Sequence, residues 1–366
     1  MRVSMKALAV EDVGQRIVEW YSCIITKDIK QAKLLKPEID IMIAKMEPDD
    51  KMLAYYQLVS LQYDLLVLRE APDEKTKALD ETILENIAVQ TNDYLNFMYY
   101  YVWGQTEFYK QRYKSAIRTY KIAERLIEKV KDPVEKAEFY QKLGISYYRI
   151  DQYTFAFSYL EQALEIFEKD SSYVMNVISC KQILAGIYSE LQQYEKAEEI
   201  YNELLLLSKP YPYYQAITAY NMGLNRILVD RLEEAAQHFN EALEFEEFRN
   251  SAIYIKAKYH VLNLQMRLGN YTEGIEQLEK EVHNIDARDI KGKLLICRGL
   301  YLNEGYSFIE KGLSILQSNE FYVECRELCE EISKHYKKID DYKMALYFLE
   351  CANEMRNRTI LGVDQS

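Results

Sequence analysis

The stretch LGISYYRIDQYTFAFSYLEQALEIF, residues 143–167, contains the pattern that decides the fold. Gly144 and Ala156 are small residues twelve positions apart, and the large Leu160 follows four positions later. Two helices approach each other closely only where side chains are small, and large residues fill the grooves beside that contact. The stretch therefore predicts two antiparallel helices packed as in a tetratricopeptide unit.

The same pattern occurs in four other segments, which lie around Trp103, Leu184, Met222 and Ile332. A weaker unit lies around Leu262–Leu278, and a degenerate one around Leu294–Leu316. The small residue of the second helix falls at positions 116, 156, 197, 235 and 274, a spacing of 38 to 41 residues. This spacing exceeds the usual period of about 34 residues, so the helices or their loops are extended. We expect an all-α fold with a right-handed tetratricopeptide superhelix over residues 93–366.

Residues 1–68 do not show the repeat. Their apolar spacing predicts helices around Val10–Thr26, Ile29–Met46 and Asp49–Leu68, where Asp49 or Asp50 can cap the third helix. The segment EAPDEKTKALDE at 70–81 is polar and contains a proline, which is typical of a link between domains. We therefore predict an N-terminal three-helix bundle over 1–68 and a helical linker over 69–92.

Charge and hydropathy limit the partners. The formal net charge is −12 and the sequence pI is about 5.1. Nucleic-acid binding needs a basic footprint, so we expect no direct nucleic-acid contact and favour positively charged partners or ligands. The acidic start of the chain differs from a signal peptide, and no run of 18 apolar residues predicts a membrane span. These features predict a cytoplasmic protein.

Motifs of catalysis and metal binding are missing from the sequence. The six scattered cysteines suggest reduced thiols, and no histidine or second cysteine pair completes a metal site around Cys325 and Cys329. The four histidines lack H-E-x-x-H spacing, and no P-loop, G-x-S-x-G or G-x-G-x-x-G motif occurs. We expect no metal or cofactor, and the residues alone favour a binding scaffold over an enzyme.

Several motifs resemble those of a known family. They occur in order between about residue 10 and residue 355: IVEWYSCI (17–24), MEPDDKMLAYYQL (46–58), YYYVWGQTEF (99–108), VEKAEFYQKLGISYY (134–148), CKQILAG (180–186) and AYNMG (219–223). These motifs resemble the Rap proteins of bacilli. The resemblance implies a quorum-sensing regulator of bacterial two-component signalling, whose bundle binds a response regulator or another transcription regulator. It also implies that a short signalling peptide, bound in the concave side of the repeats, switches the protein off and moves the bundle from a flared position to merge with the repeats.

The resemblance leaves the enzymatic activity open. Phosphatase members of the family read M-E-x-x-Q at 46–50, and the glutamine orients the water that attacks an aspartyl phosphate, as a glutamine does in GTPases. This chain has Asp50 there, with a shorter and negatively charged side chain. Gln57 lies seven residues on, about 10 Å along a helix, and is a poor substitute. Asp50 is therefore either an altered catalytic residue of a sporulation phosphatase or a solvated or capping residue.

The resemblance also implies binding residues. Glu47, Leu53 and Leu61 correspond to positions that contact the regulator, although bundle core is the alternative for both leucines. In the repeats, Asn221 corresponds to an asparagine that grips the peptide backbone, since an amide both donates and accepts.

Two further positions belong to the implied peptide site. Glu190 stands where the family has an aspartate that pairs with a basic peptide residue, and Tyr148 lies at a matching concave position, with core packing as its alternative. The family's asparagine after the Ala-Gly pair is Ile187 here, which implies a different peptide sequence. A generic repeat adaptor without a peptide switch remains a third possibility.

Overall fold

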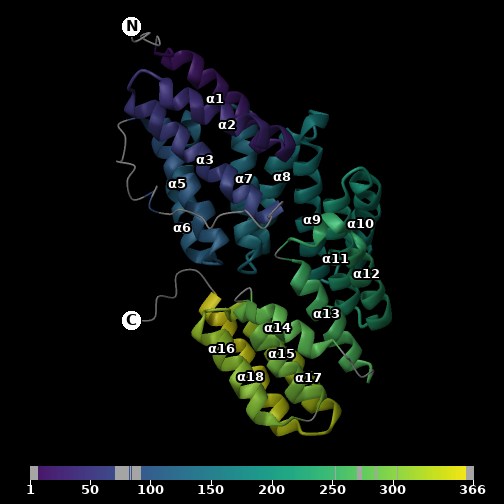
Figure 1. Cartoon of the computed structure of the whole chain (residues 1–366). Coiled ribbons are helices and arrows are strands. Elements are labelled where there is room, and N and C mark those ends of the chain that lie inside the picture. Colours follow the sequence, from purple (N-terminus) through teal and green to yellow (C-terminus); the bar gives the residue numbers. More distant parts are fainter. Residues whose placement is uncertain are drawn as a thin grey trace. The chain divides into compact units, whose positions relative to one another are not determined.

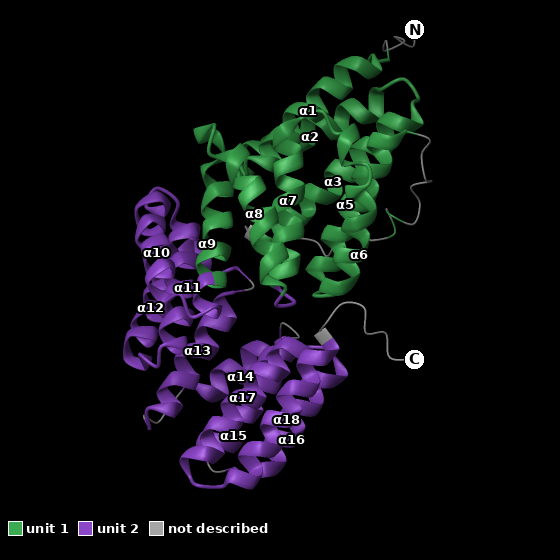
Figure 2. Cartoon of the chain, turned by 180° about the vertical axis from the view of Figure 1, so that it is seen from behind, with its two compact units in different colours: residues 1–148, 152–187 green, residues 149–151, 188–366 purple. Residues whose placement is uncertain are grey.

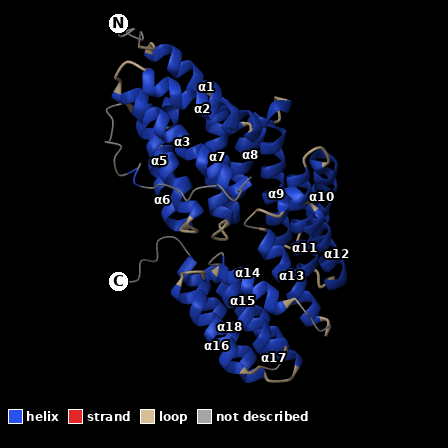
Figure 3. Cartoon of the chain, viewed as in Figure 1, coloured by secondary structure: helices blue, strands red, loops and turns tan. Residues whose placement is uncertain are grey.

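A computed structural model describes residues 7–70, 82, 84, 92–251, 253–269, 274–284, 287–302 and 304–359. In these ranges every regular element is a helix (Figures 1 and 3), and one isolated bridge joins Leu8 to Met46. The prediction of an all-α fold is confirmed. Of the predicted linker over 69–92, residues 71–81, 83 and 85–91 lie outside the described residues.

The chain forms two compact units (Figure 2). The first comprises residues 1–148 and 152–187, and the second comprises residues 149–151 and 188–366. The first unit contains the N-terminal helices together with the first two repeat pairs. Of the helices in the described ranges, none combines the length and hydropathy needed to cross a membrane.

The N-terminal bundle consists of α1 (Val10–Ile25), α2 (Ile29–Lys45) and α3 (Asp50–Glu70), so the three predicted helices are confirmed. Trp20 lies at its centre with no exposed surface, and its Nε1 donates to the carbonyl of Ala32 at 3.1 Å. The side chain of Asp49 accepts the amide of Met52 at 2.7 Å. Asp49, and not Asp50, therefore caps α3.

The remaining long helices follow in pairs. They are α5 (Asp93–Tyr109), α6 (Tyr113–Glu124), α7 (Pro133–Tyr148), α8 (Tyr153–Phe167), α9 (Val174–Glu190), α10 (Tyr194–Ser208), α11 (Pro212–Leu228), α12 (Leu232–Glu244), α13 (Tyr254–Arg267), α14 (Ile275–Asn284), α15 (Arg288–Tyr301), α16 (Tyr306–Ser318), α17 (Tyr322–Lys338) and α18 (Tyr342–Thr359).

In the pairs α7–α8 and α11–α12 the helices approach each other where a small residue meets a large one. A Cβ atom added at Gly144 would lie 2.9 Å from Cγ of Leu160, and one added at Gly223 would lie 2.8 Å from the ring of Phe239. Both large residues come sixteen positions after the glycine, as the sequence pattern predicts. The partner side chain occupies the space that a Cβ would fill, which explains why the position must be small.

The turns inside the pairs share a left-handed residue that the sequence analysis did not identify. Asp151 and Asp230 have φ of 59°, and the same turn occurs inside pairs at Gln111, Gln192 and Asp340 and between two pairs at Glu320. In each turn, the amide after this residue donates to a carbonyl five positions earlier, as from Arg231 to Arg226 at 2.9 Å. This is the Schellman arrangement that ends a helix and reverses the chain.

The C-terminal pairs depart from the expected pattern in two places. The segment interpreted as degenerate, Leu294–Leu316, belongs to a close pair in which Gly292 and Gly312 both lie at the contact: a Cβ at Gly312 would lie 2.5 Å from the carbonyl oxygen of Gly292. In the last pair the large residue at the contact is Phe348, sixteen positions after the buried Ile332, which is not a small residue, and the neighbouring Leu349 is 47% exposed.

Replacing Gly223 with valine should lower the free energy of unfolding by about 1–3 kcal/mol, because the added side chain would overlap the ring of Phe239. Urea unfolding measures the change. Asn240→Val places the same side chain on the exposed face of α12 and serves as the control. Equal effects of the two changes would contradict the proposed packing constraint.

Candidate functional site

A buried amide organises the start of the second unit. Asn225 on α11 is 2% exposed, and its Nδ2 donates to Oγ of Ser189 at 2.7 Å. Its Oδ1 accepts from Arg226 at 2.9 Å. Arg226 also donates to Glu198 at 2.8 Å and lies 3.0 Å from Glu234. These bonds hold the end of α9 against α11 and tie in α10 and α12.

Asn221 lies one helical turn before Asn225 and therefore on the same side of α11. Its side chain is partly exposed, and among the described residues its amide makes no hydrogen bond. An asparagine in the middle of a helix competes with the backbone for hydrogen bonds and needs another reason to be there. The amide of Asn221 can therefore donate to and accept from a ligand backbone.

Glu190 is the last residue of α9 and follows Ser189 directly, so the bond between Ser189 and Asn225 fixes its position. The side chain is exposed. Desolvation by the surrounding protein, together with the negative charge of Glu327, raises the pKa of Glu190 to about 7, and Arg326 opposes the shift. Crowded negative charge of this kind favours a positively charged guest.

Both negatively and positively charged side chains surround Glu190. Asp151 and Glu330 also raise its pKa. Arg326 on α17 is bonded to Asp151 and lies 3.9 Å from Glu327. Burial raises the pKa of Glu327 as well. The arginine offsets part of the negative charge, and the acidic residues remain in excess.

Tyr148 belongs to the first unit, whereas Asn221 and Glu190 belong to the second. Its ring lies over Gly186, where an added Cβ would come within 2.7 Å of the Tyr148 hydroxyl. Its ring centroid is 6.0 Å from that of Tyr153. These contacts favour a packing role for Tyr148. Ile187, which stands in place of the family asparagine, is buried and has 1% of its surface exposed.

The bundle residues divide into two groups. Glu47, which precedes α3, and Asp50, its first residue, are exposed, and Leu53, one turn after Asp50 on the same side, is 40% exposed. Leu61 has no exposed surface and packs in the core. In this arrangement Leu61 cannot contact a partner, because bundle side chains already cover it.

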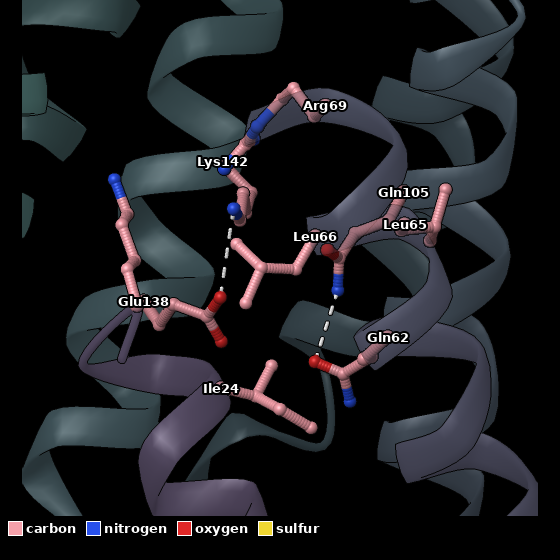
Figure 4. A pocket seen from close by; sticks show the side chains of 9 residues that line it. Ile24, Gln62, Leu65, Leu66, Arg69, Gln105, Glu138 and Lys142 are labelled. Carbon is pink, nitrogen blue, oxygen red and sulfur yellow. Dashed lines mark hydrogen bonds and ion pairs between the residues drawn. The ribbon is translucent and has the colours of Figure 1, made fainter. Parts of the chain in front are cut away.

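A small polar cavity lies inside the first unit (Figure 4). Bundle residues and repeat residues line it together: Ile24, Lys27, Gln62, Leu65, Leu66, Arg69, Gln105, Glu138 and Lys142. Gln105 donates to Gln62 at 3.3 Å, and Lys142 lies 3.6 Å from Glu138. The cavity volume of about 30 Å³ suffices for roughly two water molecules, so it is too small for a peptide.

Sequence reasoning missed Asn225 and Arg226. The spacing of Asn221 and Asn225, followed by an arginine, was a visible signal that two amides share one side of α11. The burial of Asn225 was not visible in the sequence, because it depends on Ser189 and Glu198 from neighbouring helices.

The fold and the site define a class: a three-helix bundle carried on tetratricopeptide helix pairs, with polar side chains on the repeat helices. Residues 7–68 match the family model for the N-terminal domain of response regulator aspartate phosphatase H. Residues 95–169 and 177–246 match the tetratricopeptide repeat model. The chain belongs to the Rap family.

Individual relatives agree over nearly the whole length. Regulatory protein RapG of Bacillus subtilis (strain 168) is 26% identical over 357 residues, which cover 94% of this chain and 95% of RapG. A crystal structure of a Rap protein complexed with competence and sporulation factor has a TM-score of 0.87 at 24% identity. That alignment covers 96% of this chain and 99% of the other. At 24% identity, the similarity to that crystal structure supports the fold of this chain.

One relative carries a different name. A protein of Rhodococcus hoagii named type II methyltransferase M.CeqI is 37% identical over 369 residues, which cover 98% of this chain and 70% of that protein. The aligned part of the present chain is the bundle and the repeats. The activity in that name belongs to that protein.

Replacing Asn225 with alanine should lower the free energy of unfolding by about 1–3 kcal/mol, because Ser189 and Arg226 would lose a buried partner. Urea unfolding measures this loss. Asn221→Ala, one turn away, is the matched control and should change the free energy by no more than about 0.5 kcal/mol. A larger loss for Asn221→Ala than for Asn225→Ala would contradict the assignment of roles.

Proposed function

We propose that this Rap-family protein binds a response regulator or another transcription regulator through its N-terminal bundle, and that a short peptide with a basic residue, bound in the repeats, switches it off. The observation that carries the peptide part is the amide of Asn221. It is without a partner among the described residues and lies one helical turn from Asn225, whose amide bonds Ser189, the residue before Glu190.

The chemistry of the two residues suits such a ligand. The Asn221 amide can bond both the N–H and the carbonyl of a peptide unit. The carboxylate of Glu190 can pair with a lysine or an arginine of the peptide, and this pairing is charge-assisted. Tyr148 packs over Gly186 within the first unit and is left out of this ligand site.

The regulator surface that we propose is centred on Glu47, Asp50 and Leu53. One exposed apolar side chain beside two carboxylates can combine burial of apolar surface with charge steering toward a basic partner. Leu61 is left out of this surface because it lies in the core.

The second candidate is an aspartyl-phosphate phosphatase that uses Asp50. It is favoured by the exposure of Asp50 beside Leu53 at the start of α3. Against it, a carboxylate adds negative charge beside a phosphoryl group, where the family glutamine is neutral. We therefore favour the first candidate, a protein that binds its regulator without catalysing phosphate release.

We also place the protein in the cytoplasm. All six cysteines lie in the described ranges as free thiols, and four of them are buried. Free thiols of this kind suit a reducing compartment.

Synthetic hexapeptides that contain one arginine should raise the thermal midpoint of the chain. A peptide at one hundred times its dissociation constant stabilises the bound form by about 2.7 kcal/mol. Asn221→Ala should abolish the shift without lowering the midpoint of the free protein. Thermal unfolding across a peptide library measures both effects.

Peptides with glutamate in place of arginine are the control and should give no shift in the thermal midpoint.

The pKa of Glu190 near 7 makes the predicted peptide binding depend on pH. Because only the ionised carboxylate attracts the arginine, binding should strengthen as the pH rises from 6 to 8 and should not do so in Glu190→Gln. An unchanged shift in Asn221→Ala would favour a generic repeat adaptor.

A phosphate-release assay separates the two candidates. The unsubstituted chain should leave the aspartyl phosphate of a purified response regulator to decay at its own rate, because Asp50 lacks the amide that orients water. Asp50→Gln restores that amide, and Asp50→Asn is the shorter control. If the unsubstituted chain released phosphate faster than the regulator loses it alone, the protein would be a phosphatase and not a binder without catalysis.

A further inference from the structure

The bundle and the repeats of the first unit share a buried carboxylate. We call the contact of Tyr21 on α1, Tyr55 on α3, Tyr94 on α5 and Glu135 on α7 the seam. One carboxylate oxygen of Glu135 accepts from the Tyr21 hydroxyl at 3.1 Å and from the Tyr94 hydroxyl at 2.9 Å. The Tyr55 hydroxyl shares a hydrogen bond with Tyr94. Four helices therefore meet around one acidic group.

The carboxyl group of the seam is buried, whereas Tyr55 and Tyr94 at its edge are partly exposed. Glu135 is 4% exposed and Tyr21 is 5% exposed. The Tyr21 hydroxyl also lies 3.8 Å from the sulfur of Met98, which has no exposed surface. Among the described residues, no cation forms an ion pair with Glu135. A buried carboxylate with hydroxyl partners and without an ion-pair partner is costly to keep charged.

Other titratable groups face Glu135 from each helix around it. Burial raises its pKa to about 7, the hydroxyls of Tyr94 and Tyr21 oppose this shift, and the charges of Glu138 and Asp132 add to it. Lys142 lies 3.6 Å from Glu138 and offsets part of that charge. The groups facing the seam are Tyr21 from α1, Tyr55 from α3, Tyr94 and Tyr101 from α5, Glu138 and Lys142 from α7, and Asp132 before α7.

We propose that Glu135 is a proton-operated latch: the bundle is held most firmly against the first repeats when this carboxyl is protonated, and loss of the proton loosens the seam. This inference depends on neither a peptide nor a regulator. It goes beyond the proposed function and rests on contacts within the first unit alone.

The direction of the effect follows from linkage. When the seam opens, Glu135 gains water and its pKa falls toward the ordinary value of about 4.3. The closed seam thus binds the proton more tightly than the open one, so closure is favoured at low pH and weakens as the pH rises through about 7. The ratio of open to closed seam should rise roughly tenfold between pH 6 and pH 8.

Thiol labelling can measure seam opening even when the open form is rare. Met98→Cys places a thiol beneath Tyr21, where a reagent reaches it only after the seam opens. Its labelling rate in the full chain, divided by the rate for the same chain unfolded in urea at the same pH, gives the open fraction. Peptide-level mass spectrometry separates this thiol from the six native ones.

The open fraction should rise about tenfold from pH 6 to pH 8 in Met98→Cys and stay flat when Glu135→Gln is added, since glutamine imitates the protonated acid. Glu11→Gln on the exposed face of α1 is the matched control and should keep the full rise. A flat profile in Met98→Cys, or an equal rise with Glu135→Gln, would overturn the proposal.

If Met98→Cys fails to fold, the pH dependence of unfolding gives a second measurement with the native methionine. The unfolding equilibrium constant of the unsubstituted chain should increase about tenfold more than that of Glu135→Gln between pH 6 and pH 8. Identical pH dependence of the two proteins would rule out the latch.

Discussion

The close approach of paired helices is the constraint on which the rest of the structure depends. Gly144 and Gly223 leave room for Leu160 and Phe239, and no larger side chain fits without moving the partner. A left-handed residue such as Asp151 or Asp230 then ends the first helix and directs the second one back. Asn221 is carried on α11, which this contact and this turn set against α12.

Buried polar groups form hydrogen bonds between neighbouring helix pairs. Asn225 joins α9 to α11, and in the first unit Gln141 donates to the Asn176 carbonyl at 3.0 Å and lies 3.1 Å from the sulfur of Cys180. Apolar packing alone lets helices slide, whereas buried hydrogen bonds require one register. The amide of Asn221, for which we propose a peptide ligand, can stay unbonded because its neighbour Asn225 supplies the structural bonds.

The two sites we propose differ in how they use charge. Glu190 is exposed and surrounded mainly by other acids, so it attracts a basic ligand most strongly when ionised. Glu135 is buried and bonded to tyrosine hydroxyls, so ionisation weakens the contact that contains it. The same residue type therefore serves recognition at a surface and cohesion inside a unit, and its solvent exposure determines which.

The amino-acid sequence by itself determined the helix pairs, their spacing and the N-terminal bundle, because these depend on short-range patterns such as Gly144, Ala156 and Leu160. It also carried the family motifs. Only the tertiary structure decided which side chains are exposed. Leu53 and Leu61 lie on one helix, yet Leu53 is 40% exposed and Leu61 not at all, and Glu135 meets Tyr21 from 114 positions away. Burial depends on neighbours from distant segments, which local periodicity does not encode.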